Sequence, residues 1–170
     1  MVSINPQWLL AKLDKVVQRA SGLEELDAGL PSPNVDKYFK EAHQCFLYGF
    51  PIATAVLCRA ILEAQLREAV DSDGKIESAH RGDQSYPRRL ITIATKKGLL
   101  DAGIEQRGKI DRHWAEEVID AGNWAIHDLG RFNETYGKDS RVNELLLVTR
   151  KALLQLLTRA VDKHSRTPRT

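Results

Sequence analysis

Two pairs of polar residues stand four positions apart within apolar segments of this chain. Arg59 and Glu63 form the first pair, and Asn123 and His127 form the second. Residues four apart lie on the same face of a helix, one turn from each other. A guanidinium can bind an anionic group, and an imidazole can transfer protons near neutral pH. Because buried polar groups need partners, the two pairs predict one shared polar site between two helices of a bundle.

A purely structural interpretation of these residues stays open. Glu63 could hold Arg59 in an ion pair along one helix. Asn123 and His127 could merely satisfy buried backbone groups or the carboxylate oxygens of Glu63. Gly122, which precedes the second pair, could serve only to let a neighbouring helix approach closely.

The motifs resemble those of a HEPN-like family of bacterial domains (higher eukaryote and prokaryote nucleotide-binding). The resemblance rests on an Arg-x-x-x-Glu helix at 59–63, a Gly-Asn-x-x-x-His helix at 122–127 and a Lys-Lys-Gly-Leu-Leu helix stop at 96–100. It extends from about residue 35 to about residue 157. Catalytic members of the family cleave RNA without a metal ion, usually at a dimer interface. They use an arginine that is followed shortly by a histidine.

The resemblance assigns His127 as the histidine and Asn123 as its accompanying polar residue. An arginine is absent from its usual place, because residues 120–122 are Asp, Ala and Gly, and residue 119 is Ile. The nearest upstream arginine in this segment, Arg112, lies about four helical turns from His127. Arg59 from the neighbouring helix, or Arg131 from just past the motif, could supply the cation instead.

Three functions are compatible with this pattern. The first, favoured by the missing arginine, is a non-catalytic or weakly active interaction module, homodimeric and linked to bacterial defence or nucleic-acid metabolism. Its partner would be RNA, a nucleotide or a protein of a defence system. The second is a metal-independent endoribonuclease with His127, Asn123, Arg59 and Glu63 at its catalytic site. The third is binding of RNA or a nucleotide without turnover. No metal or other cofactor is expected.

Composition indicates one domain with a hydrophobic core. The chain has 170 residues, of which 42% are hydrophobic and 28% charged, and a net charge of +2. That charge neither requires nor excludes a nucleic-acid partner. The two cysteines, Cys45 and Cys58, are expected to be buried free thiols in a reducing cytoplasm. We expect no membrane-spanning segment and no secretion signal.

Every strong hydrophobic pattern has the helical period. The expected helices span 6–21, 35–48, 52–70, 87–97, a segment from between 102 and 109 to about 127, and 139–161. Residues 29–34, 71–85 and 130–137 are expected to be loops, because they are polar or rich in Gly and Pro. The prediction is one all-α domain (1–170), consisting of an N-terminal helix and connector (1–33), an up-and-down four-helix bundle with a short cross helix (34–162) and a frayed basic tail (163–170).

Several other residues with chemically active side chains are expected to have structural roles. The basic residues at 88–89 and 96–97 are expected to form a solvated face rather than a phosphate-binding patch. His43, His80 and His164 are expected to be surface or packing residues. The three tryptophans, at 8, 114 and 124, are expected to be core or interface anchors rather than base-stacking platforms, and Trp124, beside the motif, could pack across a dimer seam.

Overall fold

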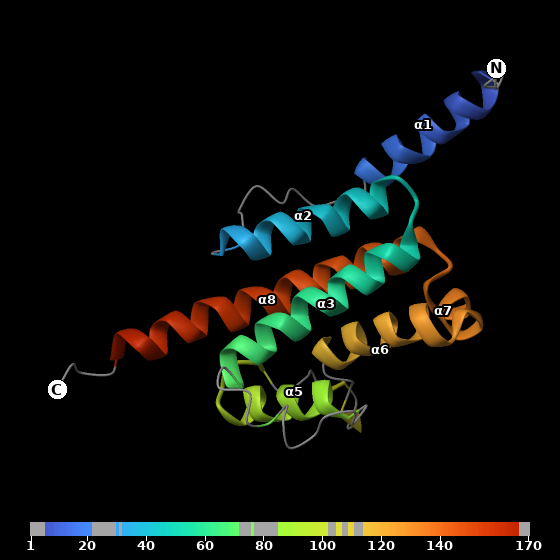
Figure 1. Ribbon diagram of the computed structural model, residues 1–170. Coiled ribbons are helices and arrows are strands. Elements are labelled where there is room, and N and C mark those ends of the chain that lie inside the picture. Colours follow the sequence, from blue (N-terminus) through green and yellow to red (C-terminus); the bar gives the residue numbers. More distant parts are fainter. Residues whose placement is uncertain are drawn as a thin grey trace.

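The structure is a computed structural model that describes residues 6–21, 30, 32–71, 76, 85–101, 105–106, 109–110 and 114–166. The predicted all-α fold is confirmed in this part of the chain (Figure 1). Its helices are α1 (Pro6–Ser21), α2 (Pro33–Leu47), α3 (Pro51–Val70), α5 (Tyr86–Lys96), α6 (Trp114–His127), α7 (Leu129–Tyr136) and α8 (Asp139–Arg166). Two strands of two residues each, β1 (Glu105–Gln106) and β2 (Lys109–Ile110), form one antiparallel pair.

Helix α3 is the central element, and it contacts α2, α5, α6 and α8. Its sequence is apolar over most of its circumference, so it can bury side chains against neighbours on several sides. Ala55, Cys58, Leu62 and Leu66 are fully buried, and their i, i+3, i+7 and i+11 spacing places them along one side of the helix. Burial raises the pKa of the Cys58 thiol to about 12, so this cysteine behaves as a small hydrophobic side chain.

The remaining long helices pack around α3 and against each other. Helix α8 contacts α2 and α6 as well as α3. In Figure 1, α2 and α6 run in one direction across the view, and α3 and α8 run in the opposite direction. The finer assignment of this arrangement to an up-and-down four-helix bundle stays a prediction.

Glycine and proline residues set the helix boundaries as the sequence predicted. Gly49 has a φ of +82° between α2 and α3, and α3 begins two residues later at Pro51. Gly98 has a φ of +66° after α5, where its amide donates to the carbonyl of Thr95 at 2.9 Å.

The predicted loop at 130–137 was wrong, because residues Leu129–Tyr136 form helix α7. The Asp128 carboxylate accepts a hydrogen bond from the Arg131 amide at 3.0 Å and so caps the helix. Phe132 and Tyr136, four residues apart, bury one face of α7. Glycines at 130 and 137 suggested a loop, but the cap and the buried aromatic face outweigh their low helix propensity.

The predicted start of the motif helix was also wrong. Helix α6 begins at Trp114, not between 102 and 109, because β1 and β2 occupy part of that segment. Strands of two residues are too short to produce a detectable alternation of apolar and polar side chains. Arg112 lies outside the described residues.

Several predictions fall on residues outside the described part of the chain. These are the cap at Asn5, residues 29 and 31 of the loop at 29–34, most of the loop at 71–85, His80 and the end of the tail at 167–170. Residues 33 and 34 of the first loop belong to α2 instead. The backbone of α8 continues to Arg166, four residues into the predicted frayed tail.

The described histidine and cysteine side chains follow the packing predictions in part. His43 is buried, its Nδ1 lies 3.0 Å from the carbonyl of Phe39, and burial lowers its pKa. Cys58 is a buried free thiol as predicted, whereas Cys45 is only half-buried. Within the described ranges, no helix is both long enough and apolar enough to cross a membrane.

Truncating a fully buried side chain at the centre of α3 should strongly destabilise the protein. We expect Leu62→Ala to lower the free energy of unfolding by about 2–5 kcal/mol, because it leaves a cavity among the packed helices. The measurement is urea unfolding followed by circular dichroism. Ile52→Ala, on the same helix but 41% exposed, is the control and should change stability by less than about 0.5 kcal/mol. Equal effects of the two substitutions would contradict the central position of α3.

Candidate functional site

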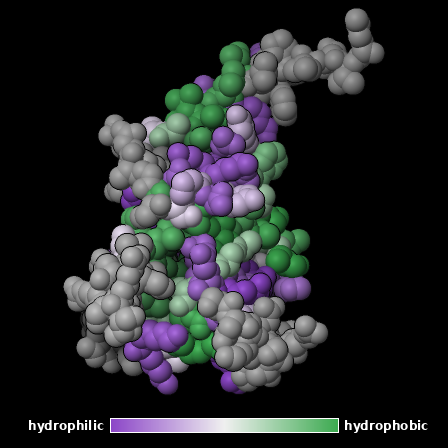
Figure 2. All heavy atoms as spheres, turned by 60° about the vertical axis from the view of Figure 1, so that its left-hand side comes forward, coloured by the Kyte–Doolittle hydropathy of each residue, from purple (hydrophilic) through white to green (hydrophobic). Residues whose placement is uncertain are grey.

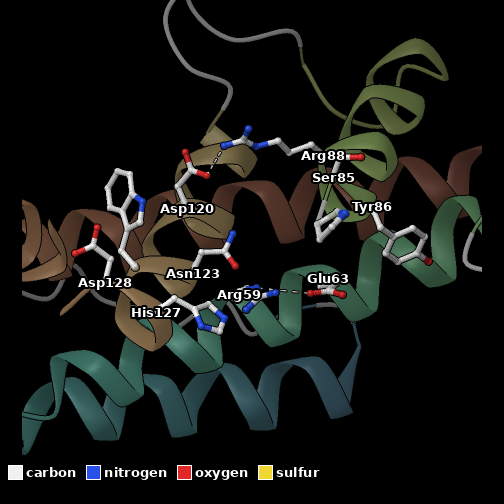
Figure 3. A pocket seen from close by; sticks show the side chains of 11 residues that line it. Arg59, Glu63, Ser85, Tyr86, Arg88, Asp120, Asn123, His127 and Asp128 are labelled. Carbon is white, nitrogen blue, oxygen red and sulfur yellow. Dashed lines mark hydrogen bonds and ion pairs between the residues drawn. The ribbon is translucent and has the colours of Figure 1, made fainter. Parts of the chain in front are cut away.

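A cleft with a volume of about 680 Å³ opens between α3, the start of α5 and the C-terminal half of α6. Figure 3 shows the side chains that line it. All four residues singled out from the sequence are among them: Arg59, Glu63, Asn123 and His127. The other lining residues are Ser85, Tyr86, Pro87, Arg88, Asp120, Trp124 and Asp128.

The two motif helices meet where Gly122 of α6 lies against Arg59 of α3. A Cβ atom at position 122 would stand 2.5 Å from Cβ and 2.6 Å from Cδ of Arg59. Real side chains do not tolerate such distances, so only glycine allows this approach. The predicted role of Gly122 in close helix packing is therefore confirmed. The same contact fixes the path of the Arg59 side chain into the cleft.

Glu63 lies between two arginines of α3. Its carboxylate is 3.7 Å from Nε of Arg59 and 3.5 Å from Nη2 of Arg67. The predicted ion pair between Arg59 and Glu63 is present, but its length exceeds that of a hydrogen bond. Nε of Arg59 is buried and makes no hydrogen bond in the described part of the chain. Glu63 thus positions the Arg59 guanidinium by its charge, but it does not accept a hydrogen bond from Nε.

Asn123 and His127 face the cleft beside Arg59. Figure 3 shows the Arg59 guanidinium between His127 and Glu63, with the Asn123 amide pointing toward it. Asn123 is half-buried and His127 is exposed. Neither side chain makes a hydrogen bond to another described residue, so the structural interpretation, in which they satisfy buried backbone groups or Glu63, does not hold there. Their polar atoms are available to a ligand.

Arg88 brings a second guanidinium into the cleft from α5. Its Nη2 donates to Oδ1 of Asp120 at 2.7 Å. Asp120 is buried, at 4% exposure, whereas the Arg88 side chain is 56% exposed. The hydrogen bond and the charge of Asp120 raise the pKa of Arg88. Arg88 is thus exposed to solvent, as the prediction of a solvated face at 88–89 has it, and it also lines the cleft.

Tyr86, the first residue of α5, lines the cleft, and Asp71 fixes its position. The Tyr86 hydroxyl donates to Oδ2 of Asp71 at 2.9 Å, and both residues are buried. Burial raises the pKa of Tyr86, and the hydrogen bond to Asp71 adds to this rise. The phenol is a neutral structural group that ties the start of α5 to the end of α3.

Trp124 lines the cleft and is half-buried. The guanidinium carbon of Arg131, on α7, lies 4.2 Å from the centre of the Trp124 ring system. The ring of Tyr136 lies 6.4 Å away, centre to centre. Arg131 itself does not line the cleft, so Arg59 is the one of the two alternative arginines that shares a site with His127. The packing of Trp124 across a dimer seam stays a prediction.

Sequence reasoning missed Arg88 and Asp120 as cleft residues. A signal for Asp120 was present, because it precedes Asn123 by three residues and His127 by seven, which places all three on one face of α6. Arg88 gave no such signal, since the docking of α5 against α6 is a tertiary contact.

Comparisons of the chain with profiles of known protein families, with curated proteins and with solved structures found no match. Among the described residues, no cluster of three or more His, Cys, Asp or Glu side chains could hold a metal ion. The function is therefore argued from the residues of the cleft.

Enlarging Gly122 should disturb the site through Arg59. We expect Gly122→Ala to lower the free energy of unfolding by about 1–3 kcal/mol, because the new methyl group overlaps the stem of Arg59. Urea unfolding measures this cost, and a double-mutant cycle with Arg59→Gly locates its origin. The cost of Gly122→Ala should largely disappear when position 59 has no side chain. An unchanged cost in that background would contradict the proposed overlap.

Proposed function

We propose that this chain is a HEPN-like domain that binds RNA in the cleft and cleaves it without a metal ion. The observation that carries the proposal is the presence of Arg59, Asn123 and His127 in one open cleft, with the last two free of hydrogen bonds to described residues. Arg59 supplies, from the neighbouring helix, the cation that is absent at 120–122. The family assignment is supported by the motifs at 59–63 and 122–127.

The proposed reaction is an intramolecular transesterification, in which the 2′-hydroxyl of a ribose attacks the phosphate on the same ribose. The 2′-oxygen of the substrate attacks the adjacent phosphorus, and the bond from phosphorus to the 5′-oxygen of the next nucleotide breaks. His127 accepts the proton from the 2′-hydroxyl and delivers a proton to the departing 5′-oxygen. The products are a 2′,3′-cyclic phosphate and a 5′-hydroxyl.

Arg59 and Asn123 have supporting roles in this reaction. The guanidinium neutralises the charge that grows on the phosphate oxygens in the transition state. The Asn123 amide, next to it, donates to and accepts from the substrate and so orients it. Glu63 holds Arg59 in position, and at 3.7 Å this ion pair leaves the guanidinium able to bind a phosphate.

Substitution of the two central residues tests the enzyme. We expect the wild-type protein to cleave labelled mixed-sequence RNA in the presence of EDTA. His127→Ala should lower the initial rate about 10²–10⁴-fold, the usual contribution of general acid–base catalysis. Arg59→Met should lower it about 10²–10³-fold, as the loss of a group that stabilises the transition state does. Gel electrophoresis gives the rates, and mass spectrometry identifies the ends.

Arg159→Ala is the matched control for these variants. Arg159 pairs with Asp101 at 2.7 Å and does not line the cleft, so its removal should leave the rate unchanged. Thermal unfolding confirms that each variant folds. Equal rates for the wild type and His127→Ala would reject His127 as the acid and base. Absence of cleavage by the wild-type protein would reject the ribonuclease.

A non-catalytic, homodimeric interaction module is the second candidate function, favoured by an exposed apolar face on α1. Leu10, Leu13 and Val17 share that face and are 60%, 52% and 65% exposed. Figure 2 shows hydrophobic side chains at the upper end of the molecule, the height at which α1 lies in Figure 1. An ion pair of 2.9 Å between Arg19 and Asp139 fastens the other end of α1 to α8.

The occupant proposed for this face is the same face of a second copy. Soluble monomers rarely expose large contiguous apolar patches, and an isologous contact would bury two such faces at once. A protein of a defence system is the alternative occupant.

A charged residue placed by substitution in the middle of the exposed apolar face of α1 tests the proposed dimer. We expect the wild-type chain to sediment as a dimer, and Leu13→Glu to shift it to a monomer, because two buried carboxylates would face each other across the contact. Analytical ultracentrifugation measures the change. Gln7→Glu, also exposed on α1, is the control for added charge and should leave the dimer intact. A monomeric wild-type protein would contradict this candidate.

A further inference from the structure

We propose that Trp124 is a nucleobase subsite, so that the cleft takes an unpaired nucleotide of single-stranded RNA. This inference rests on the proposed function, since it adds recognition of the base to recognition of the phosphate by Arg59. Three observations carry it: an aromatic ring in the cleft wall, the contacts of that ring with α7, and the Asn123 amide in the same cleft.

Trp124 lines the same cleft as Arg59, the residue proposed to bind the phosphate. On α6 it precedes His127 by three residues and follows Asp120 by four, so these three side chains share one face of the helix. All three line the same cleft. Arg131 lies over the ring system, and the part of Trp124 that lines the cleft is the surface on which a base would stack.

The indole is held by its neighbours, which prepares it for stacking. Arg131 lies over the ring system at 4.2 Å, and Tyr136 packs against it at 6.4 Å between ring centres. Both neighbours belong to α7, whose start is capped by Asp128. A side chain that is already fixed loses little conformational freedom when a ligand binds.

Asn123 lines the same cleft as Trp124 and adds a polar group to the subsite. Its amide has both a donor and an acceptor, and it makes no hydrogen bond to another described residue. It can therefore read the edge of a base that stacks on Trp124. Bases in a duplex are stacked on each other and paired, so only an unpaired nucleotide can occupy the cleft in this way.

The first measurement compares two ligands that differ only by the base. Titration calorimetry on the wild-type protein would use adenosine 5′-monophosphate and ribose 5-phosphate, neither of which can be cleaved by the proposed reaction. We expect the nucleotide to bind at least about tenfold more tightly, as stacking of one base contributes in single-strand binding proteins. Equal affinities would overturn the base subsite, and this comparison requires no variant.

Substitutions then assign the difference to Trp124. Trp124→Leu should lower the affinity for the nucleotide to that for ribose 5-phosphate, and Trp124→Phe should give an intermediate value. Trp114→Leu is the matched control, because Trp114 packs against Lys151 at 3.3 Å and does not line the cleft. A preference for the nucleotide that survives in a folded Trp124→Leu variant would overturn the assignment.

A non-cleavable oligonucleotide tests the single-strand preference. A 2′-O-methylated hexanucleotide lacks the attacking hydroxyl, and it should bind at least about tenfold more tightly alone than annealed to its complement. Equal binding of both forms would count against the subsite.

The outcomes separate this inference from the proposed function. If ribose 5-phosphate and the nucleotide bind equally, and Arg59→Met weakens both, the phosphate site stands and only the base subsite fails. If neither ligand binds and the wild-type protein cleaves no RNA, the proposed function fails and the base subsite fails with it.

Discussion

The contact between Gly122 of α6 and the stem of Arg59 on α3 is the constraint on which the cleft depends. Because position 122 has no side chain, α6 approaches α3 until a Cβ there would lie 2.5 Å from the Cβ of Arg59. At that separation Asn123 and His127 stand beside the guanidinium. A larger residue would force the helices apart, and the polar groups that the two motifs contribute would no longer share one site.

Ion pairs position the arginines of the cleft, whose lining combines the cations Arg59 and Arg88 with the carboxylates of Glu63, Asp120 and Asp128. Glu63 lies 3.7 Å from Arg59 and 3.5 Å from Arg67, so one carboxylate serves two cations. Arg88 is 56% exposed although it bonds to the buried Asp120. Both cleft pairs are partly shielded from water, because the Arg59 and Glu63 side chains are 23% and 22% exposed and Asp120 is buried. Such pairs hold their side chains more firmly than surface ion pairs do. The carboxylates thus orient the guanidinium groups.

Helix α7 connects the hydrophobic core with Trp124 in the cleft wall. Phe132 and Tyr136 bury one face of this helix, and the same element brings Arg131 over Trp124. The orientation of the indole is thereby coupled to a segment that carries no cleft-lining residue of its own beyond its cap, Asp128. Stability of α7 and the shape of the cleft wall are expected to change together.

The sequence by itself determined the helices and the two polar pairs, because helical periodicity and i, i+4 spacing are local properties. Arg59, Glu63, Asn123 and His127 were found from spacing alone, and they line one cleft. Only the tertiary structure decided which arginine accompanies His127, since that depends on how closely α6 packs on α3. It also decided that Arg88 enters the cleft and that 129–136 are helical. Docking of α5 on α6 is a contact between distant segments that no local pattern encodes. For α7, the spacing of Phe132 and Tyr136 is local, but only their burial against the rest of the fold outweighs the glycines at 130 and 137.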